Sequence, residues 1–177
     1  MIAEDWKVKA MKGITRKIAM AAVLTALVCI STMIVKIPSP LKGYINLGDC
    51  MVLLSGWLLP PVYGFLAAGL GSGLADLFSG YGVYAPATFL IKGIMALIAY
   101  GWIHILSKKG NPTFAKVMGG LLAEGFMILG YFLFEGILYG FSPSLVNIPA
   151  NGVQGAVGLL IGIFLIRIID GKIIKKL

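Results

Sequence analysis

Charged residues are scarce in this sequence, and their scarcity excludes a soluble protein. Only 12% of the 177 residues are Asp, Glu, Lys or Arg, about half the fraction typical of soluble domains. Hydrophobic residues make up 59% of the chain, and the mean hydropathy is +0.94. So few polar side chains cannot cover a water-soluble surface, and the length allows a single domain. We therefore predict an integral membrane protein for which lipid is the main solvent.

The residue types that carry catalysis and metal binding are scarce as well. The chain has one histidine, His104, and two cysteines, Cys29 and Cys50, too few for a metal site or a disulfide framework. We expect both cysteines to be buried small apolar residues. The sequence has no G-x-x-x-x-G-K-[ST] loop, no H-E-x-x-H pair and no evident Ser/His/Asp set. We therefore expect no enzyme, no catalytic residues, no metal and no cofactor.

Acidic residues are outnumbered by basic ones, and the net charge is +8. A nucleic-acid-binding protein would place its basic side chains along one stripe with exposed aromatic residues, and the sequence has no such stripe. Most basic residues instead flank apolar runs: Lys7, Lys9, Lys12, Arg16, Lys17, Lys108, Lys109, Lys116, Arg167, Lys172, Lys175 and Lys176. This distribution is typical of segments that orient a membrane protein, so we expect the bilayer rather than nucleic acid as a partner.

Apolar runs occur at six places in the chain. They lie at about residues 15–36, 47–60, 61–78, 86–106, 114–139 and 147–169. The second and third adjoin at Pro60-Pro61, where a helix must end or turn. Together they are too long for one crossing of a bilayer and short for two.

The distribution of basic residues decides how often this segment crosses. With two crossings, the N-terminus, the Lys108–Lys109 loop and the C-terminus all lie on one side, as the positive-inside rule requires. We predict an all-α membrane domain over residues 1–177 with six transmembrane helices and a short second helix. Both termini are expected to be cytoplasmic, in basic segments at 1–14 and 170–177.

With this topology, the polar side chains at membrane depth gather in the outer half. Buried polar groups are costly in lipid and are candidates for function. A channel or proton relay would need them through the full thickness, whereas a pocket open to the outside needs them only here. We predict substrate contact for Tyr44, Asn46, Asp49, Asp76, Tyr81, Tyr84, Thr88, Lys92, Tyr131, Glu135, Asn147, Asn151 and Gln154.

Several of these residues have a structural alternative. Asp49 could simply favour the start of the second helix. Asp76 and Lys92 could form an ion pair between the third and fourth helices. Glu135 could be solvated near the headgroups, and the amides at 147, 151 and 154 could join helices.

Two further polar residues lie nearer the inner side. His104 is expected at the interface, at the end of a helix. Glu124 remains open between a partner on another helix, a water contact and a protonated state.

Small residues line one side of the first helix in its cytoplasmic half. They are Ala19, Ala22 and Ala26, and the Ala22-x-x-x-Ala26 spacing permits close approach of another helix. The same spacing at Gly69-x-x-x-Gly73 and Gly158-x-x-x-Gly162 is expected to serve internal packing.

Three stretches resemble a known family. Gly43-Tyr-Ile-Asn-Leu-Gly-Asp49, Gly71-Ser-Gly-Leu-Ala-Asp-Leu-Phe-Ser-Gly-Tyr81 and Pro86-Ala-Thr-Phe-Leu-Ile-Lys-Gly93 carry the resemblance. With the six expected helices, they resemble the S components of energy-coupling factor (ECF) vitamin transporters. The resemblance is to the riboflavin-type subgroup, which includes hydroxymethylpyrimidine- and pyridoxine-type members.

The resemblance implies a mechanism that composition does not reveal. An S component of a prokaryotic cell membrane binds a vitamin from outside and docks through Ala-x-x-x-Ala, here Ala22 and Ala26, onto a transmembrane T component. Two ATPase subunits then use ATP to drive delivery inward. The first outer loop, with Tyr44 and Asn46, is implied to be a lid.

The charges in the outer half restrict the substrate. Asp49, Asp76 and Glu135 face only one cation, Lys92, so an anionic vitamin is disfavoured. Tyrosines can stack on a flat ring and amides can read its edge. We favour a pyridoxine- or hydroxymethylpyrimidine-type ligand, then riboflavin, with cobalamin also open. A self-sufficient secondary transporter, a ligand-free structural protein and a membrane enzyme are the competing hypotheses.

Overall fold

A computed structural model describes residues 2–39, 43–106 and 111–173 of the chain, with side chains described between Gly13 and Asp170. Nearly all of these residues are helical. The elements in order are α1 (Ile2–Ile34), β1 (Ile37–Pro38), β2 (Tyr44–Ile45), α2 (Gly48–Leu58), α3 (Pro61–Phe78), α4 (Ala85–Leu106), α5 (Pro112–Tyr139), α6 (Phe141–Ser144), the 3-10 turn η1 (Leu145–Asn147) and α7 (Ile148–Ile173).

The predicted all-α membrane architecture is confirmed. Among the described residues, five helices are long and apolar enough to cross a bilayer, and α2 is a shorter apolar helix. Large apolar side chains project outward along these helices, for example Leu160 on α7 and Val62 on α3. The chain is therefore a multi-pass membrane protein whose outer surface suits lipid.

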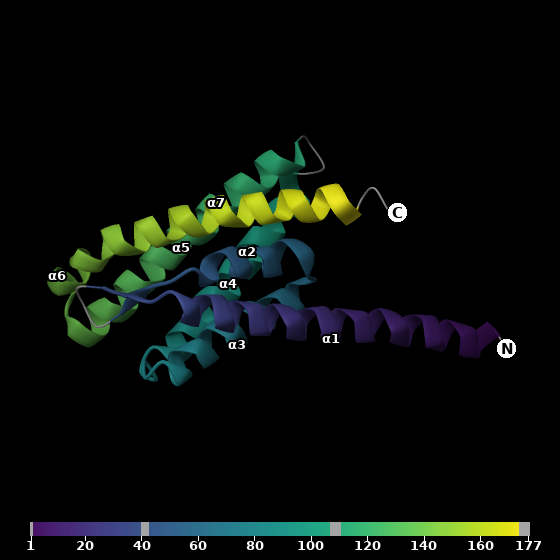
Figure 1. Cartoon of the computed structure of the whole chain (residues 1–177), viewed down its shortest axis with the longest axis horizontal. Helices are drawn as coiled ribbons and strands as arrows, with labels where there is room; N and C mark the ends of the chain where they lie inside the picture. The colour runs from purple at the N-terminus through teal and green to yellow at the C-terminus, as the bar shows by residue number, and fades with distance from the viewer. Residues whose placement is uncertain (1, 40–42, 107–110, 174–177) are drawn as a thin grey trace.

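The short helix α2 lies at the centre of the bundle (Figure 1). It packs against α1, α3, α4 and α7, and its middle residues Val52, Leu53 and Ser55 are fully buried. The start of α1 and the end of α7 lie at one end of the bundle, and the β1–β2 hairpin and α6 lie toward the other end (Figure 1). The first apolar span and the last therefore cross the bundle in opposite directions.

The break predicted at Pro60-Pro61 is confirmed. Helix α2 ends at Leu58, Leu59 is extended, and α3 begins with Pro61 in its first turn. Proline is favoured there because its missing N–H would have no helical partner and its φ already suits a helix. The chain thus reverses at once, and α2 and α3 pack against each other.

Glycines allow the central helices to approach closely, as their spacing predicted. A Cβ on Gly158 of α7 would lie 2.7 Å from the Asp49 Cβ of α2. A Cβ on Gly69 of α3 would lie 2.7 Å from the Phe89 carbonyl oxygen of α4. Any larger residue would push these helices apart, so both spacings serve internal packing.

The last helix differs slightly from its predicted bounds. The predicted run began at 147, whereas α7 begins at Ile148 and is preceded by α6 and η1. The side chains of residues 2–12, the Lys108–Lys109 loop and the end of the basic segment at 170–177 lie outside the described residues. The cytoplasmic placement of both termini stays a prediction.

Candidate functional site

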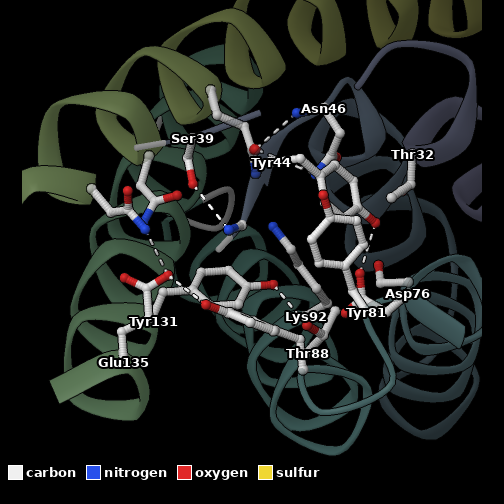
Figure 2. A pocket seen from close by; sticks show the side chains of 16 residues that line it. Thr32, Ser39, Tyr44, Asn46, Asp76, Tyr81, Thr88, Lys92, Tyr131 and Glu135 are labelled. Atoms are coloured by element: carbon white, nitrogen blue, oxygen red, sulfur yellow. Dashed lines mark hydrogen bonds between the residues drawn. The ribbon is translucent and has the colours of Figure 1, made fainter. Parts of the chain in front are cut away.

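A pocket lies under the β1–β2 hairpin and is walled by α1, α3, α4, α5 and α7 (Figure 2). Its empty volume of about 490 Å³ includes space open to solvent and falls in the range of small-ligand sites. The lining residues are Thr32, Ser39, Gly43, Tyr44, Asn46, Ser72, Asp76, Tyr81, Tyr84, Thr88, Lys92, Tyr131, Glu135, Asn147, Asn151 and Gln154.

The structure brings the predicted substrate-contact residues together around this pocket, except Asp49, which lies beneath it. Their role in binding stays a prediction. Sequence reasoning missed Thr32, Ser39, Gly43 and Ser72. Thr32 and Ser72 are small residues within apolar helices, and Ser39 and Gly43 lie in a loop rich in Gly and Pro, so nothing in the pattern distinguished them. Within the described residues, the buried hydroxyls of Thr32 and Ser72 have no hydrogen-bond partner.

Asp49 and Lys92 form a buried ion pair at the base of the pocket. The second Asp49 oxygen, Oδ2, accepts a hydrogen bond of 2.7 Å from Gln154 Nε2. The alternative of an ion pair between Asp76 and Lys92 is therefore wrong. The close approach of α2 to α7 at Gly158 brings the Asp49 carboxylate within reach of Gln154.

The alternative that Asp49 favours the start of the second helix agrees with the structure, but it does not account for all of the residue's contacts. The residue preceding α2 is Leu47, whose side chain does not cap the helix, and the Gly48 N–H donates instead to Asn46 Oδ1 at 2.8 Å. Asp49 lies in the first turn, where a carboxylate is favourable, but both of its oxygens are bonded to Lys92 and Gln154.

Tyrosines form one wall of the pocket. The rings of Tyr44 and Tyr81 lie 4.7 Å apart at 48°, and those of Tyr81 and Tyr84 lie 6.4 Å apart, nearly edge to face. Tyr131 donates to Thr88 Oγ1 at 3.1 Å, and Lys92 Nζ lies 5.5 Å from the Tyr131 ring centre. This wall presents π-faces to which a flat ring can stack.

Asp76 and Glu135 each use one oxygen within the protein. Asp76 Oδ1 accepts from Tyr44 Oη at 2.7 Å, and Glu135 Oε1 accepts from Asn147 Nδ2 at 2.9 Å. Glu135 is buried, so the alternative that it is solvated near headgroups is wrong. Within the described residues, Asp76 Oδ2 and Glu135 Oε2 are buried with no hydrogen-bond partner. Because both residues line the pocket, a rotation of each side chain would present these two oxygens as acceptors to a ligand that carries N–H or O–H groups.

The hairpin closes over the pocket and is tied down on two sides. Tyr44 donates to Asp76 of α3, and the Asn46 backbone N–H donates to Gln154 Oε1 of α7 at 2.9 Å. Burial, followed by the nearby Asp76 charge, raises the pKa of Tyr44 well above its ordinary value. Tyr44 therefore stays a neutral hydrogen-bond donor. We call residues 37–39 and 43–46 the lid.

Glu124 and His104 lie apart from the pocket. Glu124 is buried where α5 meets Gly155 of α7, and within the described residues neither of its oxygens has a hydrogen-bond partner. His104 is exposed in the last turn of α4 and stacks on Tyr100 at 3.9 Å, as expected for a residue at a helix end. Cys29 and Cys50 are free; Cys50 is buried as expected, whereas Cys29 is only half-buried.

The small-residue face of α1 points away from the bundle. Ala19, Ala22 and Ala26 are all exposed, whereas Leu24 and Val28 on the opposite side are buried. Within the described chain, these alanines are thus left open to a partner helix.

Comparison with known proteins agrees with the fold. The model of the family described as "ECF-type riboflavin transporter, S component" matches residues 12–171. A Pyrococcus woesei protein described as "Uncharacterized protein in gap 3'region" is 36% identical over 137 residues, which is 76% of this chain and 88% of that protein. The solved structure of the S component of a bacterial ECF transporter has a TM-score of 0.72 and 25% identity, covering 89% of this chain and 96% of that chain.

Proposed function

This chain belongs to the family of ECF-type riboflavin transporter S components, and on that premise we propose that it captures an uncharged, flat heteroaromatic vitamin from outside a prokaryotic cell. The observation that carries the proposal is the lidded pocket with a tyrosine wall and two spare carboxylate oxygens. The residues that line the pocket are the proposed contacts to the vitamin. Asp49 lies beneath them and would act indirectly, by holding Lys92 in place.

Riboflavin is the first candidate substrate, because the family whose model matches is described by that vitamin. Its ring carries an imide N–H and its side chain carries hydroxyls, which suit Asp76 Oδ2 and Glu135 Oε2. Lys92 is already neutralised by Asp49, so Asp76 and Glu135 leave an acidic excess that repels anionic vitamins.

Pyridoxine- and hydroxymethylpyrimidine-type compounds are the second candidates. They are smaller, carry hydroxyl or amino donors, and tolerate the same acidic excess. The substrate favoured from sequence thus stays a prediction beside riboflavin.

Binding tests separate these candidates. Addition of the purified protein to riboflavin should quench the fluorescence of the vitamin. Pyridoxine or hydroxymethylpyrimidine should reverse this quenching only if it binds in the same pocket. Tyr81→Leu should weaken binding by about fivefold, since stacking contributes roughly 1 kcal/mol. Tyr63→Leu, at the other end of α3, is the matched control. Absence of a response to all three compounds would contradict the proposed substrate class.

The partners proposed for delivery are a T component and two ATPases, as in the family. The exposed Ala19, Ala22 and Ala26 support a helix-docking face on α1. Ala22→Trp and Ala26→Trp should abolish complex formation but leave ligand binding unchanged. Leu160→Trp, exposed on α7, is the size-matched control. Substrate uptake by this chain alone in proteoliposomes would overturn the proposal in favour of a secondary transporter.

A further inference from the structure

Gln154 joins the lid to the buried ion pair, because the two ends of its amide bond to different parts of the molecule. We propose that Gln154 is a positioning residue that couples lid closure to the Asp49–Lys92 pair. The consequence for ligand release rests on the proposed function, whereas the coupling itself is a property of the protein alone.

The oxygen of the amide holds the lid. Gln154 Oε1 accepts from the Asn46 backbone N–H at 2.9 Å and from Asn46 Nδ2 at 3.3 Å. Asn46 is itself fixed to the start of α2, because its Oδ1 accepts from the Gly48 N–H at 2.8 Å. The last residue of the lid is therefore anchored between α2 and α7.

The nitrogen of the same amide holds the ion pair. Gln154 Nε2 donates to Asp49 Oδ2, and Lys92 occupies the other oxygen of Asp49. The exposed fractions of Asp49, Lys92 and Gln154 are 0%, 2% and 3%. If one of these three side chains loses its partner, no water is at hand to take the partner's place, so the lost interaction is costly.

The chemistry of the neighbours permits one amide orientation. A carboxylate only accepts and a backbone N–H only donates, so Gln154 must place nitrogen toward Asp49 and oxygen toward Asn46. If Asp49 no longer accepts, the amide loses one of the two contacts that fix this orientation, and its bond to the lid weakens. Because Lys92 also lines the pocket, ligand contact and lid position are linked through Gln154.

Two matched double variants test the coupling. Asp49→Asn with Lys92→Met removes both charges but keeps an oxygen that can accept from Gln154. Asp49→Leu with Lys92→Met removes the same charges and also that acceptor, with a side chain of similar size. Any direct effect of losing Lys92 is common to both variants and cancels in the comparison.

The first readout is hydrogen–deuterium exchange of the segment 44–48 in the ligand-free protein. The Leu variant should exchange about tenfold faster than the Asn variant, as expected for loss of a buried hydrogen bond. Gln154→Met alone should exchange at least as fast as the Leu variant, and the two changes combined should raise the rate by less than the product of their separate effects. Equal exchange in the two double variants, or additive effects of Gln154→Met, would overturn the coupling. If the Leu variant does not fold, wild-type exchange in Gln154→Met is the overturning result.

The second readout is the rate of riboflavin release, followed by fluorescence. The Leu variant should release the vitamin about tenfold faster than the Asn variant, because the lid is held more weakly. Equal release rates would overturn the link between lid and ligand. If the wild-type protein binds no riboflavin, the substrate proposal fails, while the exchange experiment still decides the coupling.

Discussion

The two ion pairs in the described part of the chain join helices in very different surroundings. Asp49–Lys92 links α2 to α4 beneath the pocket, and the side chains are 0% and 3% exposed. Lys116–Asp170 links α5 to α7 near the end of the bundle where α1 begins, and the side chains are 14% and 40% exposed. The partners are chemically identical, so their contributions differ only through solvent and neighbours.

Solvent decides what each pair does. Water and salt screen Lys116–Asp170, and a lone partner there would be rehydrated. A lone Asp49 or Lys92 would stay buried without a counter-charge, which is far more costly than the pair itself. The exposed pair Lys116–Asp170 therefore stabilises the fold only weakly. The buried pair Asp49–Lys92 joins α2 to α4, and through Gln154 it also holds α7 and the lid.

The largest expected effect comes from breaking the buried pair on one side. Lys92→Met should lower the free energy of unfolding by about 3–5 kcal/mol, because the Asp49 carboxylate is left buried without a cation. Adding Asp49→Leu should recover most of this loss. Unfolding by SDS in mixed micelles measures both variants. A loss below about 1 kcal/mol in the single variant would show that the two pairs are equivalent.

The second-largest effect is expected when the lid above the buried pair loses one of its hydrogen bonds. Tyr44→Phe removes the hydroxyl that donates to Asp76 Oδ1. Hydrogen bonds to charged groups contribute about 1.5–3 kcal/mol, so vitamin release should become at least about tenfold faster. Tyr100→Phe, near the end of α4 where its ring stacks on His104, is the control and should release at the wild-type rate.

A third buried acid extends the comparison to a carboxylate without a cation. Glu124→Leu should raise the free energy of unfolding by about 1–3 kcal/mol, because it removes two buried oxygens that have no hydrogen-bond partner in the described chain. Glu135→Leu should lower it, since it removes the oxygen that accepts from Asn147. Thermal unfolding in detergent distinguishes the two signs, and a loss for Glu124→Leu would indicate that this acid has a stabilising partner.

The smallest effect is expected at the exposed pair. Lys116→Met should change the free energy of unfolding by about 0–1 kcal/mol, and less at high salt. The same SDS titration measures it. A loss comparable to that of Lys92→Met would contradict the conclusion that burial separates the two pairs.

The helices could be predicted from sequence because lipid imposes a simple rule. Apolar runs mark the spans, and Pro60-Pro61 marks the reversal between α2 and α3. The residues around the pocket could also be anticipated, because polar side chains at membrane depth are rare and gathered in one half. Depth along each helix can be read from the chain once the spans are known.

The pairing of charges could not be predicted, because it depends on how each helix is rotated about its axis. Asp76 and Asp49 lie at similar depth, and the sequence does not reveal which one faces Lys92. In the structure Asp49 faces Lys92, and Gly158, which brings α7 against α2, places Gln154 beside the other Asp49 oxygen. Glu124 remained unassigned for the same reason, since its neighbour Gly155 offers no side chain to recognise.

The position of α2 has a consequence for the route of a solute. Beneath Asp49, the described helices meet in a continuous apolar core around Leu53, Met95 and Met127, all fully buried. A polar molecule resting on the ion pair would have to disrupt this core to continue in the same direction. We therefore expect the mouth beneath the lid to serve as both entrance and exit, in agreement with the reorientation of the whole bundle in the membrane that the resemblance to ECF S components implies.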